Sequence, residues 1–175
     1  MKKRILLHDP LTIRPLEIGD TRALLAFANN LIEEDTYLML SGKKMTYAAE
    51  KKYVTDSLTL VRKKEKIHLI AEVDGVIAGS AEIRRGEKRK HHIGEIGISV
   101  LKKFRQEGIG RRLMSELIGQ GKLLGLRMLM LHCFENNAAA LGLYKKFGFV
   151  ACGLLPEALK YHGEYIGEVT MFKNL

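Results

Sequence analysis

Residues 100–111, Val-Leu-Lys-Lys-Phe-Arg-Gln-Glu-Gly-Ile-Gly-Arg, decide how the rest of the chain is arranged. They follow an apolar segment rich in β-branched residues, Ile93 to Val100, which predicts a buried strand. They lead into a segment that begins at Ile109 and carries apolar residues at helical spacing. The stretch therefore predicts a strand, a short basic loop and a helix, with Gly108 and Gly110 at the junction.

The two glycines indicate an anion site at the start of this helix. Glycine lets a ligand approach the backbone closely and leaves the first N–H groups of the helix uncovered. Those groups and the helix dipole attract anions, and Arg105, Arg111 and Arg112 add positive charge. We interpret the stretch as a cradle for a pyrophosphate; a tight turn with solvated arginines is the alternative. It is neither a Rossmann fingerprint nor a Walker A loop, because the third glycine and the Gly-Lys-Ser/Thr signature are absent.

Length and composition favour one globular domain. The 175 residues are 46% hydrophobic and 28% charged, and we predict a single domain over residues 1–175. No apolar run reaches the length of a membrane span and the start, Met1 to Arg4, lacks a signal-peptide core, so we expect a cytoplasmic protein. The formal charge of +9 favours anionic partners such as nucleic acids, acidic peptides or phosphate-bearing cofactors. Neither the two cysteines nor the paired histidines have metal-ligand spacing, so no metal site is predicted.

Periodicity predicts the remaining elements. Strands are expected over about 11–16, 66–73, 76–85, 126–134, 150–155 and 165–173, and further helices over about 21–32, 47–62 and 137–147. Asp20, Thr46 and Asn136 or Asn137 are suitable helix caps, and Asp74-Gly75 is a hairpin turn. The last two strands are expected to be joined by a loop that contains Pro156 and Gly163. Glu33-Glu34-Asp35 is interpreted as a solvated helix end, with a contact to an acceptor as the alternative.

Two motifs together resemble the GNAT family of N-acetyltransferases. Arg105, Gly108 and Gly110 fill the Gln/Arg-x-x-Gly-x-Gly/Ala pattern of its acetyl-CoA loop, although Gln106 stands where many members have glycine. The second motif, Asn-x-x-Ala-x-x-Leu-Tyr-x-x-x-Gly-Phe, comprises Asn137, Ala140, Leu143, Tyr144, Gly148 and Phe149. Both motifs occur in the family's order, with the expected strand between them.

The resemblance implies a fold and a reaction. The fold is mixed α/β (α+β), a single domain whose central, twisted, mostly antiparallel sheet of six to seven strands is flanked by about four helices. One parallel pair of strands splays apart. The implied reaction is direct transfer of an acetyl group from acetyl-CoA to a primary amine of a small molecule, an amino acid or a peptide or protein N-terminus. The first two helices line the acceptor side in this family.

Site residues are carried over position by position. The resemblance implies that the pantetheine arm pairs with the strand backbone and that loop amides bind the pyrophosphate. The cofactor-binding residues are then Ile98, Ser99, Val100, Arg105, Gln106, Glu107, Gly108, Ile109, Gly110, Arg111, Asn137, Ala140 and Tyr144. Tyr144 matches the tyrosine that donates a proton to the departing CoA sulfur, a role that suits a phenol. A tyrosine packed in a helix face and a simple cap at Asn137 are the structural alternatives.

The general base is less well defined by the sequence. Glu95 stands where several family members have a catalytic glutamate, and His132 stands where another subgroup has its glutamate. We favour Glu95 over His132; a structural glutamate, a core histidine and deprotonation through water are the alternatives.

Two other functions compete with acetyl transfer. An acyl-CoA sensor without turnover would keep the binding motifs, although the presence of Tyr144 argues against it. A nucleic-acid-binding module is suggested by the charge and by the basic stretch 86–92, but no interleaved aromatic residues support it. The resemblance leaves a homodimer open, since family members often dimerise.

Overall fold

The computed structural model describes residues 11–175, so the basic start that bears on a signal peptide lies outside the described residues. The strands are β1 (Leu11–Pro15), β2 (Lys66–Val73), β3 (Val76–Arg85), β4 (Ile93–Val100), β5 (Met128–Phe134), β6 (Val150–Tyr161) and β7 (Glu164–Asn174). The helices are α1 (Thr21–Glu34), α2 (Tyr47–Arg62), α3 (Ile109–Leu123) and α4 (Ala138–Lys146). In this part of the chain no helix has the length and apolar character needed to cross a membrane.

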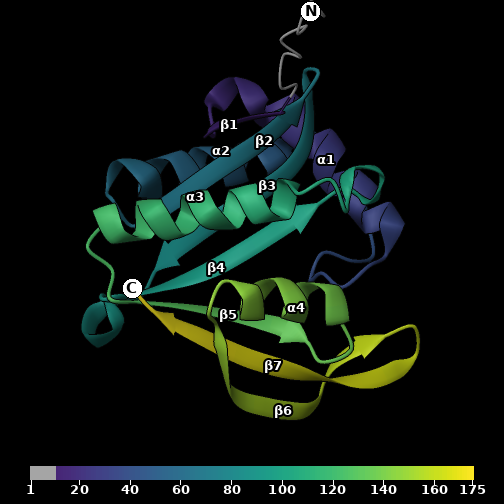
Figure 1. Cartoon of the computed structure of the whole chain (residues 1–175). Helices are drawn as coiled ribbons and strands as arrows, with labels where there is room; N and C mark the ends of the chain where they lie inside the picture. Colours follow the sequence, from purple (N-terminus) through teal and green to yellow (C-terminus); the bar gives the residue numbers. More distant parts are fainter. Residues whose placement is uncertain (1–10) are drawn as a thin grey trace, which may run out of the picture.

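The seven strands form one sheet in the order β1-β2-β3-β4-β5-β7-β6 (Figure 1). Every neighbouring pair is antiparallel except β4 and β5, which are parallel. A strand–helix–strand connection through α3 produces that parallel pair, as the order of elements in the sequence predicts. The predicted fold class is therefore confirmed.

Helices cover both faces of the sheet and leave its centre buried. Leu113 and Leu117 of α3 are fully buried in the main core cluster, which also contains Tyr144 of α4. On the opposite face, Leu24 of α1 and Val54 of α2 pack in a second cluster. The functional side chains discussed below lie between these two layers.

The parallel pair opens into a wedge. Only the first three residues of β4 pair with β5, in the register Ile93–Met128 to Glu95–Met130, and the strands then diverge (Figure 1). At the paired end, Gly94 leaves room for core side chains, because a Cβ atom there would lie 2.5 Å from Ile83 Cγ2 and 2.6 Å from Leu126 Cδ1. Beyond Glu95, the edge of β4 that faces β5 has no strand partner within residues 11–175.

Several local predictions are confirmed and two are wrong. Thr46 caps α2 and Asn137 caps α4 through their side-chain oxygens, and Asp74-Gly75 closes the β2–β3 hairpin with positive φ at both residues. Asp20 precedes α1 but makes no capping bond, because its carboxylate is paired with Arg14. Pro156 does not lie in a loop: β6 runs through it, and an irregularity between Leu155 and Leu159 accommodates a residue that cannot donate a ladder hydrogen bond.

Candidate functional site

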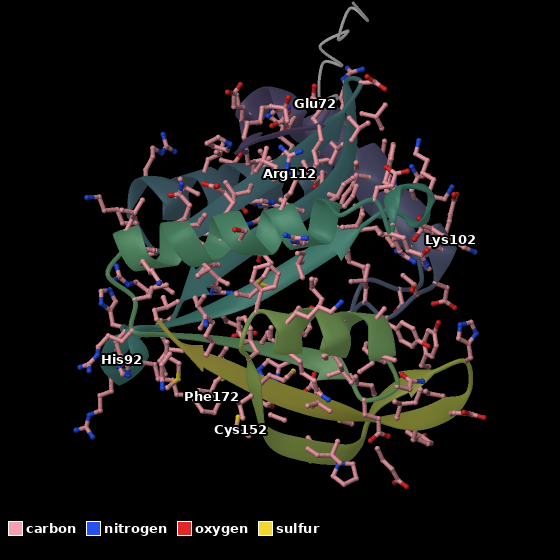
Figure 2. All side chains as sticks on the ribbon, in the orientation of Figure 1. Glu72, His92, Lys102, Arg112, Cys152 and Phe172 are labelled. Atoms are coloured by element: carbon pink, nitrogen blue, oxygen red, sulfur yellow. The ribbon has the colours of Figure 1, made fainter. Side chains whose placement is uncertain are left out.

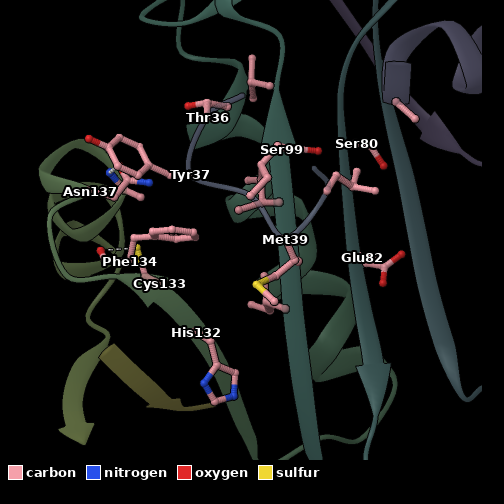
Figure 3. A pocket seen from close by; sticks show the side chains of 18 of the residues that line it. Thr36, Tyr37, Met39, Ser80, Glu82, Ser99, His132, Cys133, Phe134 and Asn137 are labelled. Atoms are coloured by element: carbon pink, nitrogen blue, oxygen red, sulfur yellow. Dashed lines mark hydrogen bonds between the residues drawn. The ribbon is translucent and has the colours of Figure 1, made fainter. Parts of the chain in front are cut away.

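A cavity of about 740 Å³ occupies the wedge. Tyr144 and Asn137 line it on the α4 side, and Leu24 and Phe27 of α1 line it on the opposite face of the sheet. The cavity therefore reaches both faces through the gap between β4 and β5. Figure 3 shows His132, Cys133 and Phe134 along one wall and Ser80 and Glu82 along the other, with Ser99 between them.

Nine of the sequence-predicted site residues line this cavity. They are Glu95, Ile98, Ser99, Val100, Arg105, His132, Asn137, Ala140 and Tyr144. The structure thus brings together residues from β4, β5 and α4. The loop residues 106–111 do not line it; they follow Arg105 directly and lead into α3.

The start of α3 has the backbone that the glycine pattern predicts. Gly108 precedes the helix with φ +81°, a conformation that favours glycine, and a Cβ atom there would meet nothing within 4 Å. A Cβ atom on Gly110 would make only ordinary contacts with Leu143 and Val100, at 3.6 and 3.9 Å. The helix start is therefore open, and its first backbone N–H groups have no partner inside the helix.

Glu34, at the acidic end of α1, binds the loop that follows β4. Glu34 Oε1 accepts a hydrogen bond from the Lys102 backbone N–H at 2.7 Å, and Oε2 is paired with the Arg105 guanidinium. Arg105 Nε also donates to the Val100 carbonyl at 2.9 Å. Glu34 is therefore not the solvated helix end that we expected, and the Arg105 guanidinium already has a carboxylate partner.

Tyr144 is suited to hold a proton. Its side chain is buried, and its hydroxyl has no hydrogen-bond partner within residues 11–175. Burial, together with the neighbouring Cys133 thiol, raises the pKa of Tyr144 well above its usual value. The phenol is therefore neutral at physiological pH. Asn137 both caps α4, accepting from the Ala140 N–H at 3.1 Å, and lines the cavity.

The two candidate bases differ in their contacts. Glu95 is exposed to the cavity, and no hydrogen bond or ion pair engages its carboxylate within residues 11–175. His132 Nδ1 lies 3.2 Å from Thr170 Oγ1 and 3.7 Å from Glu168 Oε2, so one ring nitrogen already has polar neighbours. Both side chains lie where the two strands begin to diverge.

Sequence reasoning missed a polar wall contributed by α2, β2 and β3. Glu82 Oε2 accepts hydrogen bonds from Tyr53 at 2.7 Å and pairs with Lys66 Nζ at 2.6 Å. His68 Nε2 lies 2.9 Å from Ser80 Oγ, whereas its buried Nδ1 has no hydrogen-bond partner. Polar residues alternating along β2 and β3 were the available signal, but only the strand register shows that they face one cavity.

Burial governs the protonation states in this wall. Burial lowers the pKa of His68 to about 4, so its ring is neutral at physiological pH. For Glu82, burial opposes ionisation, but the charge of Lys66 and the hydrogen bonds from Lys66 and Tyr53 prevail and lower its pKa. Burial raises the pKa of Tyr53, with the Glu82 charge adding to the effect. Around Glu82 the wall therefore presents an ionised carboxylate beside the neutral rings of His68 and Tyr53.

The basic stretch 86–92 is remote from this cavity. Residues 86–92 connect β3 to β4 at the end where β4 begins, whereas the wedge opens at its other end. Figure 2 shows His92 and Lys102 at opposite ends of this strand. The stretch is therefore not part of the candidate site.

Within residues 11–175 the mixed sheet has one parallel pair, which opens over a cavity that reaches both faces, and this is the arrangement expected of N-acetyltransferase-like folds. A model of the acetyltransferase (GNAT) family matches residues 29–149, and the chain belongs to this family. An L-amino acid N-acetyltransferase of Escherichia coli K12 is 31% identical over 100 residues, which are 56% of this chain and 62% of that protein. The chain therefore spans less than two thirds of the length of this curated relative.

Solved structures share the fold over almost the entire chain. An acetyltransferase of the GNAT family from Streptococcus pneumoniae superposes with a TM-score of 0.85 at 29% identity, covering 94% of this chain and 99% of that one. A phosphinothricin acetyltransferase of Sinorhizobium meliloti, solved in complex with acetyl-CoA, has a TM-score of 0.80 at 20% identity, covering 95% and 89%. The second likeness concerns the fold alone.

Proposed function

We propose that this protein is an N-acetyltransferase that moves an acetyl group from acetyl-CoA directly to a primary amine. One observation carries the proposal: an unpaired strand edge and the buried, neutral phenol of Tyr144 line the same cavity. An acyl donor bound along that edge would present its reacting end to the phenol. The names of the relatives, which include an L-amino acid N-acetyltransferase, support the reaction class.

The residues present fit acetyl-CoA. The free backbone of Ile98 and Ser99 can pair with the amides of a pantetheine arm, as an added strand would. The open helix start at Gly108 offers N–H groups and the positive end of the α3 dipole to a pyrophosphate. Because Glu34 already neutralises Arg105, we assign Arg105 the role of holding this loop in place. The amides of residues 106–111 remain the proposed anion ligands.

The chemistry requires a proton acceptor and a proton donor. When bound, acetyl-CoA supplies the acetyl group as a thioester, so a C–N bond to the acceptor forms as the C–S bond breaks. Tyr144 would give its hydroxyl proton to the sulfur and regain a proton from water. A backbone N–H of β4 would stabilise the negative charge that develops on the carbonyl oxygen.

The amine must lose a proton before it can attack. We assign this role to Glu95, because its carboxylate is unengaged and lies on β4 at the start of the wedge. His132 is the alternative base: contacts from Thr170 and Glu168 to Nδ1 leave Nε2 available. Comparing glutamine variants at the two positions separates the assignments.

A thiol-release assay tests the function. The protein is incubated with acetyl-CoA and a panel of amino acids, polyamines, aminoglycosides and N-terminal peptides, and free CoA is followed with time. Acceptor-dependent release above the rate of hydrolysis supports the proposal. Acetyl-CoA binding without release of CoA for any acceptor would instead favour a sensor, and the absence of CoA binding would refute both the transferase and the sensor.

As part of the same proposal, residues 1–175 form one domain that works in the cytoplasm. Sedimentation velocity tests whether the protein is a homodimer.

A further inference from the structure

The acceptor side of the cavity is acidic in a chain with a formal charge of +9. Four carboxylates line the cavity, those of Glu50, Glu82, Glu95 and Glu168. The only Lys or Arg among the described lining residues is Arg105, which is paired with Glu34. Glu82 is itself paired with Lys66, so the negative charge of the lining comes from Glu50, Glu95 and Glu168, whereas the chain as a whole is positive.

Glu50 is a buried carboxylate without a partner. Only 3% of the residue is exposed, and its side chain lines the cavity from the first turn of α2. No hydrogen bond or ion pair engages this carboxylate within residues 11–175. Because an unpaired buried charge destabilises a protein, its natural complement is a cation supplied by a ligand.

Glu82 offers a second free oxygen in the same wall. Its contacts with Tyr53, Lys66 and His68 all involve Oε2, and Oε1 has no partner in the described part of the chain. Glu50 and Tyr53 are three residues apart on one face of α2, and the Tyr53 hydroxyl donates to Glu82, so all three side chains line the same part of the cavity. Lys66 is tied to Glu82 and to Ser57 and its side chain is only 5% exposed, so it is not available to a ligand carboxylate.

The rest of this side of the cavity is apolar. Leu24 and Phe27 of α1 and Met39 and Met45 of the following segment line it. Such a surface suits methylene groups, which gain free energy on leaving water. Figure 3 shows Met39 reaching across the space in front of β4, between the wall that carries His132 and the wall that carries Glu82.

We propose that the acceptor is an aliphatic diamine or polyamine, whose distal ammonium binds Glu50 and Glu82 while its other amine is acetylated. This inference rests on the proposed acetyl transfer and names its substrate class. An amino acid would place its α-carboxylate among four carboxylates, with no unpaired cation on the described lining to receive it. An alkyl diamine can pair its distal ammonium with the carboxylates of Glu50 and Glu82 and place its methylene groups against the apolar residues beside them.

The test compares three five-carbon acceptors that differ only at the far end. Cadaverine ends in an ammonium, n-pentylamine in a methyl group and 5-aminopentanoate in a carboxylate. We measure kcat/KM for each by thiol release at saturating acetyl-CoA. Cadaverine is expected to exceed n-pentylamine by about 10-fold or more, as for a charged hydrogen bond of ordinary strength, and 5-aminopentanoate is expected to be the poorest.

Isosteric glutamine variants test whether Glu50 and Glu82 cause the preference for cadaverine. In Glu50→Gln the advantage of cadaverine over n-pentylamine should shrink to within about 3-fold, with n-pentylamine itself unchanged. Glu82→Gln should also lower the ratio of kcat/KM for cadaverine to kcat/KM for n-pentylamine. The ratio is used because the loss of the Lys66 partner would affect both acceptors alike and therefore cancels. Glu116→Gln, an exposed change on α3 outside the cavity, is the matched control and should leave the ratio intact.

Calorimetric titration of cadaverine into the CoA-loaded protein separates this inference from the reaction itself. Suppose that cadaverine binds, that Glu50→Gln weakens this binding, and that no amine is acetylated. This result would refute the proposed acetyl transfer but would support the ammonium-binding site at Glu50 and Glu82. If acetyl transfer to n-pentylamine or 5-aminopentanoate is at least as fast as transfer to cadaverine, the proposed ammonium-binding site is refuted, whereas the proposed acetyl transfer is supported. Equal loss for all three acceptors in Glu50→Gln would also overturn it, since Glu50 would then serve the chemistry rather than recognition.

Discussion

Replacing Tyr144 by phenylalanine isolates one hydroxyl in the proposed mechanism. The ring is buried against Phe149, with the centroids 6.1 Å apart, and phenylalanine keeps that packing. Because the hydroxyl has no partner within residues 11–175, its removal leaves no donor or acceptor unsatisfied. We therefore expect the free energy of unfolding to change by less than about 1 kcal/mol.

The catalytic effect of the same change should be much larger. Loss of a general acid costs about 10²- to 10⁴-fold in rate, which corresponds to roughly 3–5 kcal/mol in the activation barrier. We expect kcat to fall by at least about 100-fold while the Kd for acetyl-CoA stays within about 2-fold. Steady-state thiol release gives kcat, and isothermal titration of a non-reacting CoA analogue gives Kd.

The control for Tyr144→Phe is Tyr165→Phe, an exposed tyrosine on β7 outside the cavity. Equal kcat values for the two variants would remove Tyr144 from the proton transfer. Because burial raises the pKa of Tyr144, the phenol should still hold its proton at pH 9. A proton donor fails as the pH rises through its pKa, so a loss of kcat between pH 7 and 9 that disappears in Tyr144→Phe would show that Tyr144 titrates in this range and would contradict the raised pKa.

Three further perturbations probe the rest of the site. Gly108→Glu should raise the Kd for acetyl-CoA by at least about 100-fold by placing a negative charge at the anion site, whereas Gly163→Glu, at another open glycine with positive φ, should not. Glu95→Gln should lower kcat/KM by about 100-fold and more than His132→Gln does, and the reverse order would make His132 the base. Glu50→Gln should stabilise the fold at pH 7 by roughly 0.5–2 kcal/mol in chemical denaturation. Since burial raises the pKa of Glu50, its carboxylate penalises folding more as the pH rises above 4.5, so the gain should shrink toward that pH; a constant gain would refute the unpaired charge.

Local chemistry made much of the fold predictable. The Asp74-Gly75 turn, the Thr46 cap and the apolar periodicity of α3 act over a few residues, so the sequence displays them directly. The errors arose where a distant partner changed a residue's role. Asp20 has the right position for a cap, but Arg14 takes its carboxylate. Glu34 is a helix end by sequence, yet the Lys102 amide, 68 residues away, binds it.

By itself, the sequence determined the order of elements, the helix start at Gly108 and the presence of Tyr144, because spacing along one chain specifies a strand, a turn or a helix. Only the tertiary structure decided which side chains share the cavity. An irregularity between Ala71 and Glu72 shifts the β2–β3 register by one residue and sets His68 opposite Glu82. In a regular hairpin the two would lie on opposite faces of the sheet, because successive side chains alternate. Lys66 and His68 lie on the same face of the sheet as Glu82 because of that single extra residue, which the local sequence does not reveal.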